Sequence, residues 1–148
     1  MRKSILALAL LPMCANAADG TAFGIDLYGR SYHHDLAPGE RDKLNEANVG
    51  WGVHVAHTVG KHRFVAETGT LLNSYYDSAY WIGGQYTYRV FRHLEPGIMV
   101  RHWETTHDTY PDKLLSKYLM VSVPVTDQFR ISAIVRPSGY IAFMSYDF

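Results

Sequence analysis

From Thr21 to the C-terminus, the sequence is built of short runs in which apolar and polar residues alternate, and turn-forming residues separate one run from the next. Alternation with a period of two is typical of a β-strand with two unlike faces, because successive side chains point to opposite sides. The runs predict about eight strands, at 22–33, 49–59, 62–73, 78–91, 95–105, 114–125, 129–137 and 140–148. Such a chain can form a soluble β-sandwich, with its apolar faces inside, or a membrane β-barrel, with its apolar faces outside.

The two faces of the predicted strands favour the membrane barrel. In the last strand one face carries Tyr140, Ala142, Met144, Tyr146 and Phe148. In the strand before it, Ile131 and Val135 alternate with Arg130 and Arg136. Tyrosines near strand ends, from a total of eleven, are typical of the aromatic girdle at a membrane surface. The arginines can then face only a polar interior.

The lengths of the connections are a second indication. Every second connection is short, at 60–61, 92–94 and 126–128. The other connections are 34–48, 74–77, 106–113 and 138–139, and they include the two longest. Outer-membrane barrels have short periplasmic turns and longer extracellular loops. The pattern therefore predicts a barrel with both termini on the periplasmic side.

The first 17 residues have the pattern of a secretory signal peptide. A basic start, Met1-Arg2-Lys3, precedes the apolar run from Ile5 to Leu11 and the cleavage motif Ala15-Asn16-Ala17. The apolar run is too short for a membrane-spanning helix, which needs about 20 residues. Cleavage after Ala17 would remove the only cysteine, Cys14, and would leave 12 basic and 14 acidic residues, a net charge of −2. That balance gives no indication of nucleic-acid binding.

The C-terminal residue gives the first resemblance to known proteins. A chain that ends on Phe148 after alternating apolar residues resembles the C-terminal strand of outer-membrane proteins. The resemblance implies recognition by the barrel assembly machinery. We therefore expect an all-β fold, with a signal peptide over 1–17 and an eight-stranded antiparallel transmembrane β-barrel over 18–148. We expect a monomer in the bacterial outer membrane, with membrane lipids and lipopolysaccharide as partners and with no cofactor.

Ten polar residues are predicted to point into the barrel. They are Asp26, Arg30, His54, Arg63, Glu67, Gln85, Arg89, Arg101, Arg130 and Arg136. Buried charges must be paired, and Glu67 with Arg101 or Arg89 would be natural partners. An eight-stranded barrel is just wide enough for side chains to fill. We therefore expect a lumen network that includes Glu67, Arg89, Arg101 and Arg130 and that plugs the barrel, with a ligand pocket or a pore as the alternative.

The predicted extracellular rim brings together residue types that could support catalysis. It carries His33, His34 and Asp35 after the first strand, Asn73, Ser74 and Asp77 after the third, and Glu104, His107, Asp108, Arg136 and Ser138 farther on. Serine, histidine and a carboxylate form the nucleophile, base and orienting group that acyl transfer requires. Polar loops are also simply solvated, and no spacing at this rim indicates a metal site.

Five short motifs, spread through most of the chain, resemble the lipid A palmitoyltransferase family of outer-membrane barrels. They are Leu44-Asn45-Glu46, Gly50-Trp51-Gly52, Leu72-Asn73-Ser74-Tyr75, Ile82-Gly83-Gly84-Gln85-Tyr86 and Val135-Arg136-Pro137-Ser138-Gly139. The resemblance implies acyl transfer by a rim aspartate–serine pair and by a histidine at the end of the first strand.

The residues of this chain match that family in part. The serine corresponds to Ser74, whereas the aspartate corresponds to Asn73. The family's histidine falls near Gly29, a few residues before His33 and His34. The family also has an amphipathic helix before its first strand, for which the segment between Ala17 and Thr21 leaves almost no room.

Two functions remain open at this point. The favoured one is a non-enzymatic membrane and surface-binding role, since small barrels that act as adhesins or stress-response proteins resemble this chain in size, filled interior and tyrosine content. The alternative is a lipid A-modifying acyltransferase. It would use Ser74 with His33 or His34, and Asp35 or Asp77 as the orienting group.

Overall fold

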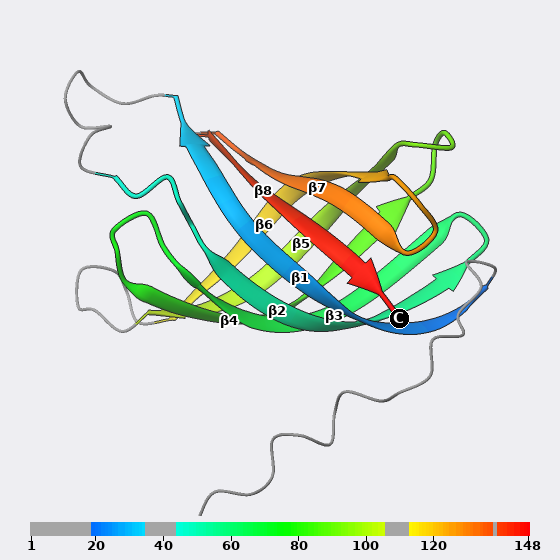
Figure 1. Cartoon of the computed structure of the whole chain (residues 1–148), viewed down its shortest axis with the longest axis horizontal. Helices are drawn as coiled ribbons and strands as arrows, with labels where there is room; N and C mark the ends of the chain where they lie inside the picture. The colour runs from blue at the N-terminus through cyan, green and yellow to red at the C-terminus, as the bar shows by residue number, and fades with distance from the viewer. Residues whose placement is uncertain (1–18, 35–43, 106–112, 138) are drawn as a thin grey trace, which may run out of the picture.

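The computed structural model of the chain describes residues 19–34, 44–105, 113–137 and 139–148 and consists of eight β-strands (Figure 1). Their bounds are β1 Gly20–His33, β2 Gly50–Val59, β3 His62–Leu72, β4 Ser78–Tyr88, β5 Glu95–Thr105, β6 Lys113–Pro124, β7 Phe129–Arg136 and β8 Gly139–Asp147. The predicted signal peptide at 1–17 lies outside the described residues. Within the described residues, no helix has the length and apolar character needed to cross a membrane.

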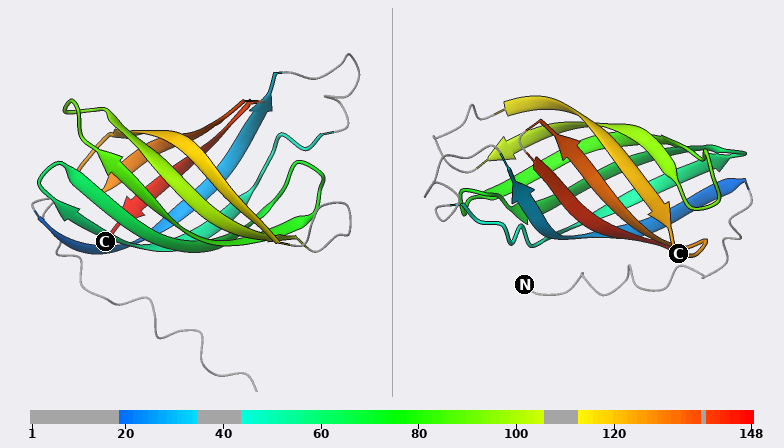
Figure 2. Two further views of the ribbon diagram at one scale, coloured as in Figure 1. Left: turned by 180° about the vertical axis from the view of Figure 1, so that it is seen from behind. Right: turned by 90° about the horizontal axis from the view of Figure 1, so that it is seen from above.

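The strands form a closed antiparallel barrel in sequence order, β1 to β8, and β8 pairs with β1. Figure 2 shows the strands strongly tilted around one axis, and Figure 1 shows the C-terminal strand beside the first one. The predicted eight-stranded antiparallel barrel is therefore confirmed. The predicted strand at 78–91 ends earlier, at Tyr88, because Phe91 turns back to bridge with Leu94.

The connections divide the barrel into two ends. We call the end that carries 34–49, 73–77, 106–112 and 137–138 the long-loop end, and the end that carries 60–61, 89–94 and 125–128 the short-turn end. The predicted difference in length between the two sets of connections is present, although 89–94 is longer than expected.

The side chains alternate between an apolar outer wall and a buried lumen. In β2, Trp51, Val53 and Val55 are exposed on the outside, while His54 and Ala56 are buried inside. A soluble protein would reverse these faces, because exposed contiguous apolar surface is unfavourable in water. The wall of this barrel is therefore suited to lipid.

A β-bulge in β1 changes which face its last residues occupy. Tyr28 pairs with Phe143 in β8, and the next pair along the two strands is Arg30 with Ala142. Gly29 therefore has no partner in β8 and is an extra residue. Gly29 and Arg30 are both exposed, and Ser31 is buried. The prediction that Arg30 points inward is therefore wrong, because period-two counting does not hold across a bulge.

The lumen has two chemically different halves. Towards the long-loop end it is filled by an apolar and aromatic cluster, made of Tyr28, Leu71, Ala79, Trp81, Met99, Trp103, Met120, Ile134, Ile141 and Phe143. Towards the short-turn end it holds buried charges, made of Asp26, His54, Arg63, Glu95, Arg130 and Asp147. The sequence predicted a charge-filled interior, whereas the structure confines most of the charge to one half.

Two glycines make room for the bulkiest side chain of the aromatic cluster. Gly52, Gly69, Trp81 and Trp103 are paired across four neighbouring strands. A Cβ atom on Gly69 would lie 2.4 Å from Cζ2 of Trp81, and one on Gly52 would lie 3.2 Å from it. The indole of Trp81 therefore packs over backbone where any larger residue would displace it.

Candidate functional site

The long-loop end brings a serine and a histidine into contact. His33 is the last residue of β1, and Ser74 follows β3. The Nε2 atom of His33 lies 3.0 Å from the Oγ atom of Ser74, and the Oγ atom of Ser31 lies 3.5 Å from the same nitrogen. His33 and Ser74 are both half-buried. The pair is placed where a hydroxyl could give its proton to an imidazole.

The segment before β2 holds this pair together across 41 positions of sequence. The N–H of Ser31 donates to the carbonyl of Glu46 at 2.9 Å, and the N–H of Asn45 donates to the carbonyl of Ser74 at 2.8 Å. The side chains of Asn45 and Asn48, both buried, donate to the carbonyls of Asn73 and Leu72. The end of β1 and the β3–β4 turn are thus tied to the same short segment.

The β3–β4 turn is itself held by Asn73. Its Oδ1 atom accepts hydrogen bonds from the backbone N–H groups of Tyr75, at 2.8 Å, and Asp77, at 3.0 Å. Within the turn, Tyr76 has a φ of 65°, a left-handed conformation that a bulky residue rarely adopts. Tyr75 and Tyr76 are 48% and 61% exposed. The turn therefore has a fixed backbone, from which two aromatic side chains are exposed.

The structure brings together only some of the rim residues singled out from sequence. It joins Ser74 to His33, and it leaves His34 exposed at the end of β1. Asp77 closes the β3–β4 turn through its backbone. Asp35, His107, Asp108 and Ser138 lie outside the described residues. Among the residues that are described, no group of three or more His, Cys, Asp or Glu is arranged to hold a metal ion.

Inside the lumen, one fully buried arginine contacts side chains from several strands. Arg101, 0% exposed, donates from Nε to Oε1 of Glu67 at 2.6 Å and from Nη2 to Oε2 at 3.0 Å. It also donates to the hydroxyl of Tyr28, and its guanidinium lies 4.6 Å from the ring centre of Trp81. Gln85 donates to the same carboxylate at 2.6 Å. Arg101 thus contacts both a buried carboxylate and the rings of the apolar cluster.

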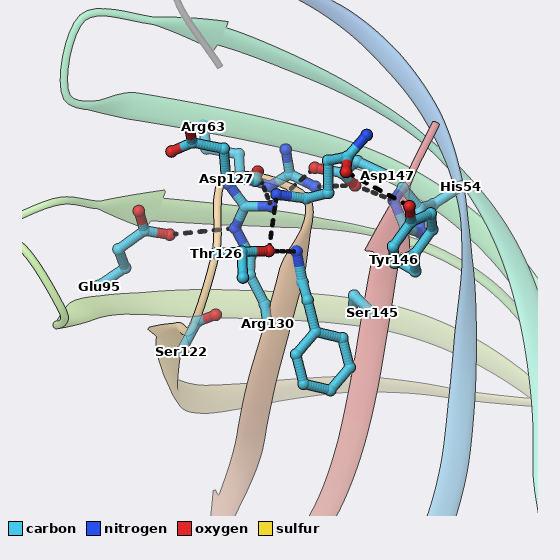
Figure 3. Close-up of polar contacts among 12 residues, drawn as sticks. His54, Arg63, Glu95, Ser122, Thr126, Asp127, Arg130, Ser145, Tyr146 and Asp147 are labelled. Carbon is cyan, nitrogen blue, oxygen red and sulfur yellow. Dashed lines mark hydrogen bonds and ion pairs between the residues drawn. The ribbon is translucent and has the colours of Figure 1, made fainter. Parts of the chain in front are cut away.

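The charged half is organised around Asp147, the penultimate residue (Figure 3). Its Oδ1 atom accepts from Nε2 of His54 at 2.8 Å and from Nη2 of Arg63 at 2.9 Å, and its Oδ2 atom accepts from Nη1 of Arg130 at 2.7 Å. The other ring nitrogen of His54 lies 3.0 Å from Oδ2 of Asp26. Five inward side chains from five strands are thus joined in the interior.

The structure pairs Glu67 with one of its two expected partners, and it gives Arg89 and Arg130 other carboxylates. Glu67 pairs with Arg101, but Arg89 pairs with Glu95 at 2.7 Å and not with Glu67. Arg130 pairs with Asp147 and lies 3.7 Å from Glu95. Alternation in the last strand places Asp147 on the face opposite Tyr146 and Phe148, but the pattern gives no indication that this residue is the centre of the network.

The charged half leaves little free space. A void of about 10 Å³ lies among the side chains of Asp26, His54, Arg63, Thr87 and Arg130 and their neighbours. Such a void holds about one water molecule. The hydroxyl of Thr87, which is buried and has no protein partner, borders this void. Among the described residues, the charged half of the lumen is therefore filled by side chains and leaves no open passage.

No protein-family model matches the sequence, and no curated relative matches it either. Solved structures do match the fold. The outer membrane protein Ail of Yersinia pestis in a phospholipid nanodisc gives a TM-score of 0.53 at 7% identity, covering 87% of this chain and 100% of Ail. Ail in complex with the heparin analogue sucrose octasulfate gives 0.50 at 8% identity, covering 88% and 98%.

A designed transmembrane β-barrel is similar to the same degree. It gives a TM-score of 0.52 at 14% identity and covers 86% of this chain and 95% of the design. At such identities the likeness concerns the fold alone. The closed eight-stranded barrel, the apolar wall and the buried polar lumen together make this chain a small β-barrel of the bacterial outer-membrane type.

Proposed function

We propose that the chain resides in the outer membrane with its long-loop end at the cell surface, and that it functions there by binding, not by conducting solutes. The filled lumen argues against a pore, because an eight-stranded barrel packed with side chains leaves no passage. The difference in connection length supports the orientation, since long loops of outer-membrane barrels face outwards. Biogenesis through the barrel assembly machinery belongs to the same proposal.

The observation that carries the binding role is the preformed β3–β4 turn. Asn73 fixes the turn, and Tyr75 and Tyr76 are exposed upon it. An ordered aromatic ring loses little conformational entropy when it binds and offers both an apolar face and a polar tip. A strained left-handed tyrosine is also typical of ligand-contacting positions.

The class of ligand that we propose is a surface saccharide, with the sugar portion of lipopolysaccharide as the first candidate. Lipopolysaccharide would surround the rim of a barrel in this orientation. The complex of Ail, a protein of the same fold, with a sulfated sugar is an example of saccharide binding by such a barrel. Tyr75 and Tyr76 are the residues that we expect to contact the sugar.

Binding to purified barrels in nanodiscs tests this proposal. Lipopolysaccharide or sucrose octasulfate should bind the parent protein, and the Tyr75→Ala/Tyr76→Ala variant should lose about 2 kcal/mol of binding energy or more, as expected for aromatic contact residues. Tyr88→Ala, which removes an exposed tyrosine at the short-turn end, is the matched control. Equal binding by all three proteins would contradict the role of the turn.

A second function, acyl transfer to lipid A, is favoured by the contact between His33 and Ser74. Proximity of nucleophile and base is the geometric requirement for covalent acyl catalysis, and the 3.0 Å contact meets it.

In this alternative the chemistry proceeds in two steps. The Oγ atom of Ser74 attacks the ester carbonyl of a donor lipid while Nε2 of His33 takes the hydroxyl proton, and the donor's alcohol leaves with that proton. A hydroxyl of lipid A then attacks the acyl-serine ester, and His33 takes the proton of that hydroxyl and passes it to the Oγ atom of Ser74 as the serine leaves. Asp77 or Asp35 would orient the imidazole.

Mass spectrometry of lipid A separates the two functions. Lipid A from membranes with and without the protein should differ by one acyl chain if the transferase proposal is correct, and Ser74→Ala should abolish the difference. The neighbouring rim variant Ser78→Ala should retain it. Unchanged lipid A in membranes that contain the folded parent barrel would contradict the transferase and leave the binding role.

A further inference from the structure

The lipid-facing wall of the barrel has a hollow over β3, β4 and β5. Its volume is about 530 Å³, and its floor is formed by Ala66 and Gly84, with Phe64, Tyr86, Ile98 and Val100 around it. Val55 and His57 of the neighbouring strand β2 also border it. The register of β3, β4 and β5 explains why the hollow is present. Ala66, Gly84 and Val100 are paired across the three strands, and the next row towards the short-turn end is Phe64, Tyr86 and Ile98. Two small side chains thus lie beside a row of large ones.

The surroundings of the hollow indicate where it lies relative to the membrane surface. The hydroxyl of Tyr86 is 3.0 Å from Nδ1 of His62, the first residue of β3. A tyrosine whose ring is on the apolar wall and whose hydroxyl meets a polar group is typical of a membrane interface. The hollow therefore extends from the interfacial belt of the short-turn end towards the middle of the wall.

Cationic side chains lie beyond this belt. Lys61, in the β2–β3 turn, directly precedes His62, and Arg92 lies in the β4–β5 turn. The two turns are adjacent, because the N–H of Arg89 donates to the carbonyl of Lys61 at 2.8 Å. Lys61 and Arg92 are both exposed. Both cations thus belong to adjacent turns at the end of the wall where the hollow begins, and the carboxylate of Asp19 accepts from the N–H of Gly60 in the first of these turns.

Of the possible occupants, a lipid chain fits best. Water would have almost no polar partner on these walls. A second copy related by a two-fold axis would place hollow against hollow and leave a void at the centre of its interface. A phospholipid matches both features, with hydrocarbon for the hollow and a phosphate for the cations.

We propose that the hollow over β3, β4 and β5 binds an acyl chain of a phospholipid from the periplasmic leaflet, with the phosphate of that lipid at Lys61 and Arg92. The assignment of the leaflet rests on the orientation proposed above. The barrel would thus carry a specifically bound lipid on its wall, apart from any ligand at its rim.

Native mass spectrometry tests this inference. The barrel is released from nanodiscs of phosphatidylethanolamine and phosphatidylglycerol, and its retained phospholipid is measured. Ala66→Leu fills the floor of the hollow and should reduce retention roughly tenfold, since it removes buried apolar contact. Ala133→Leu is the matched control, because Ala133 lies on the outward face of β7, outside the hollow. A heat-shift assay on gels verifies that each variant is folded.

The headgroup site has its own variant. Lys61→Gln/Arg92→Gln should also weaken retention, whereas Arg30→Gln, which removes an exposed charge at the opposite end of the barrel, should not. No retained phospholipid on the parent barrel, or equal loss in Ala66→Leu and Ala133→Leu, would overturn the proposal. A dimer that Ala66→Leu converts to a monomer would overturn it in favour of a second copy.

The leaflet is tested separately, by labelling the long loops in intact cells. Labelled loops support the orientation on which the assignment rests. Inaccessible loops would overturn the orientation and the periplasmic leaflet together, while the retention experiment would still decide whether the hollow binds lipid.

Discussion

Among single residues, Arg101 combines complete burial with the most varied set of partners. It pairs with Glu67, donates to Tyr28 and lies against the rings of Trp81 and Trp103. A guanidinium can do this because its planar fork matches a carboxylate and its faces stack on aromatic rings. A lysine at this position could not reproduce the arrangement.

Removing this arginine should destabilise the barrel by leaving Glu67 buried without its counter-charge. We expect Arg101→Met to lower the free energy of unfolding by about 3–5 kcal/mol. Urea titration of the barrel in lipid vesicles measures this. Arg30→Met, which removes an exposed arginine, should change the free energy of unfolding by less than about 0.5 kcal/mol. In Arg101→Met/Glu67→Leu much of the loss should be recovered. A double variant as unstable as the single one would contradict the explanation by charge burial.

For single residues, the sequence predicted which side chains point into the barrel better than it predicted which of them pair with one another. Alternation placed Glu67, Arg101 and Arg130 inside, because the pattern of each strand determines its own faces. Which inward residues share one level depends on the stagger between strands, and a single sequence contains no direct signal for it. The pairing of Arg89 with Glu95 was missed for this reason.

At the scale of the strand, two glycines within strands have opposite roles. Gly29 forms the bulge of β1, and a Cβ atom there would have no neighbour within 4 Å. Gly69 lies against Trp81, and a Cβ atom there would be 2.4 Å from the indole. The first glycine is therefore replaceable, and the second one is required for packing.

Alanine at each position tests this difference. Gly69→Ala should lower the free energy of unfolding by about 1–3 kcal/mol, as overpacking does. Gly29→Ala should be neutral, or stabilising by up to about 1 kcal/mol, because it restricts the unfolded chain. Urea unfolding followed on gels measures both. The explanation would be wrong if the two variants lost equal stability.

Strand boundaries were predictable from sequence because turn residues and alternation mark them directly. The strand that begins at Lys113 was expected from 114, and the one that ends at Arg136 was expected to end at 137. The bulge was missed although its extra residue is a glycine, because an isolated glycine within a strand can equally mark a close approach of backbone or a bend. Because of the bulge, the consecutive residues Gly29 and Arg30 are both exposed.

At the scale of the whole molecule, Asp147 connects the two ends of the chain. From β8 it contacts His54 on β2, Arg63 on β3 and Arg130 on β7, while Ser145 on the same strand donates to Asp26 on β1 at 2.6 Å. The contacts with β1, β2 and β3 form only when the barrel is closed, whereas Arg130 lies on the hairpin neighbour of β8. The network therefore stabilises closure more than it stabilises any single hairpin.

Asp147→Asn should weaken closure, because it leaves Arg63 and Arg130 buried without their carboxylate. We expect the free energy of unfolding to fall by about 3–5 kcal/mol and the folded band on gels to be lost at a lower temperature. Asp127→Asn, an exposed change in the neighbouring turn, is the control. Identical melting of the two variants would count against Asp147 as the closing residue.

The barrel as a whole was predictable because neighbours in sequence are neighbours in space throughout, apart from the pairing of β8 with β1. The contact of His33 with Ser74 was expected only as one possibility. It depends on the hydrogen bonds of residues 45–48, which carry no alternating pattern. The division of the lumen into two halves was not expected, because it appears only when the eight strands are in register.

The placement of the tryptophans gives the protein a built-in optical reporter. Trp51 is 58% exposed on the wall, whereas Trp81 and Trp103 lie inside against Arg101. Brominated lipids should quench the fluorescence of Trp51 alone, and aqueous iodide should reach none of the three until the barrel opens. The tryptophan fluorescence of the native chain can therefore report insertion into the membrane and closure of the barrel as two separate events, without any added dye.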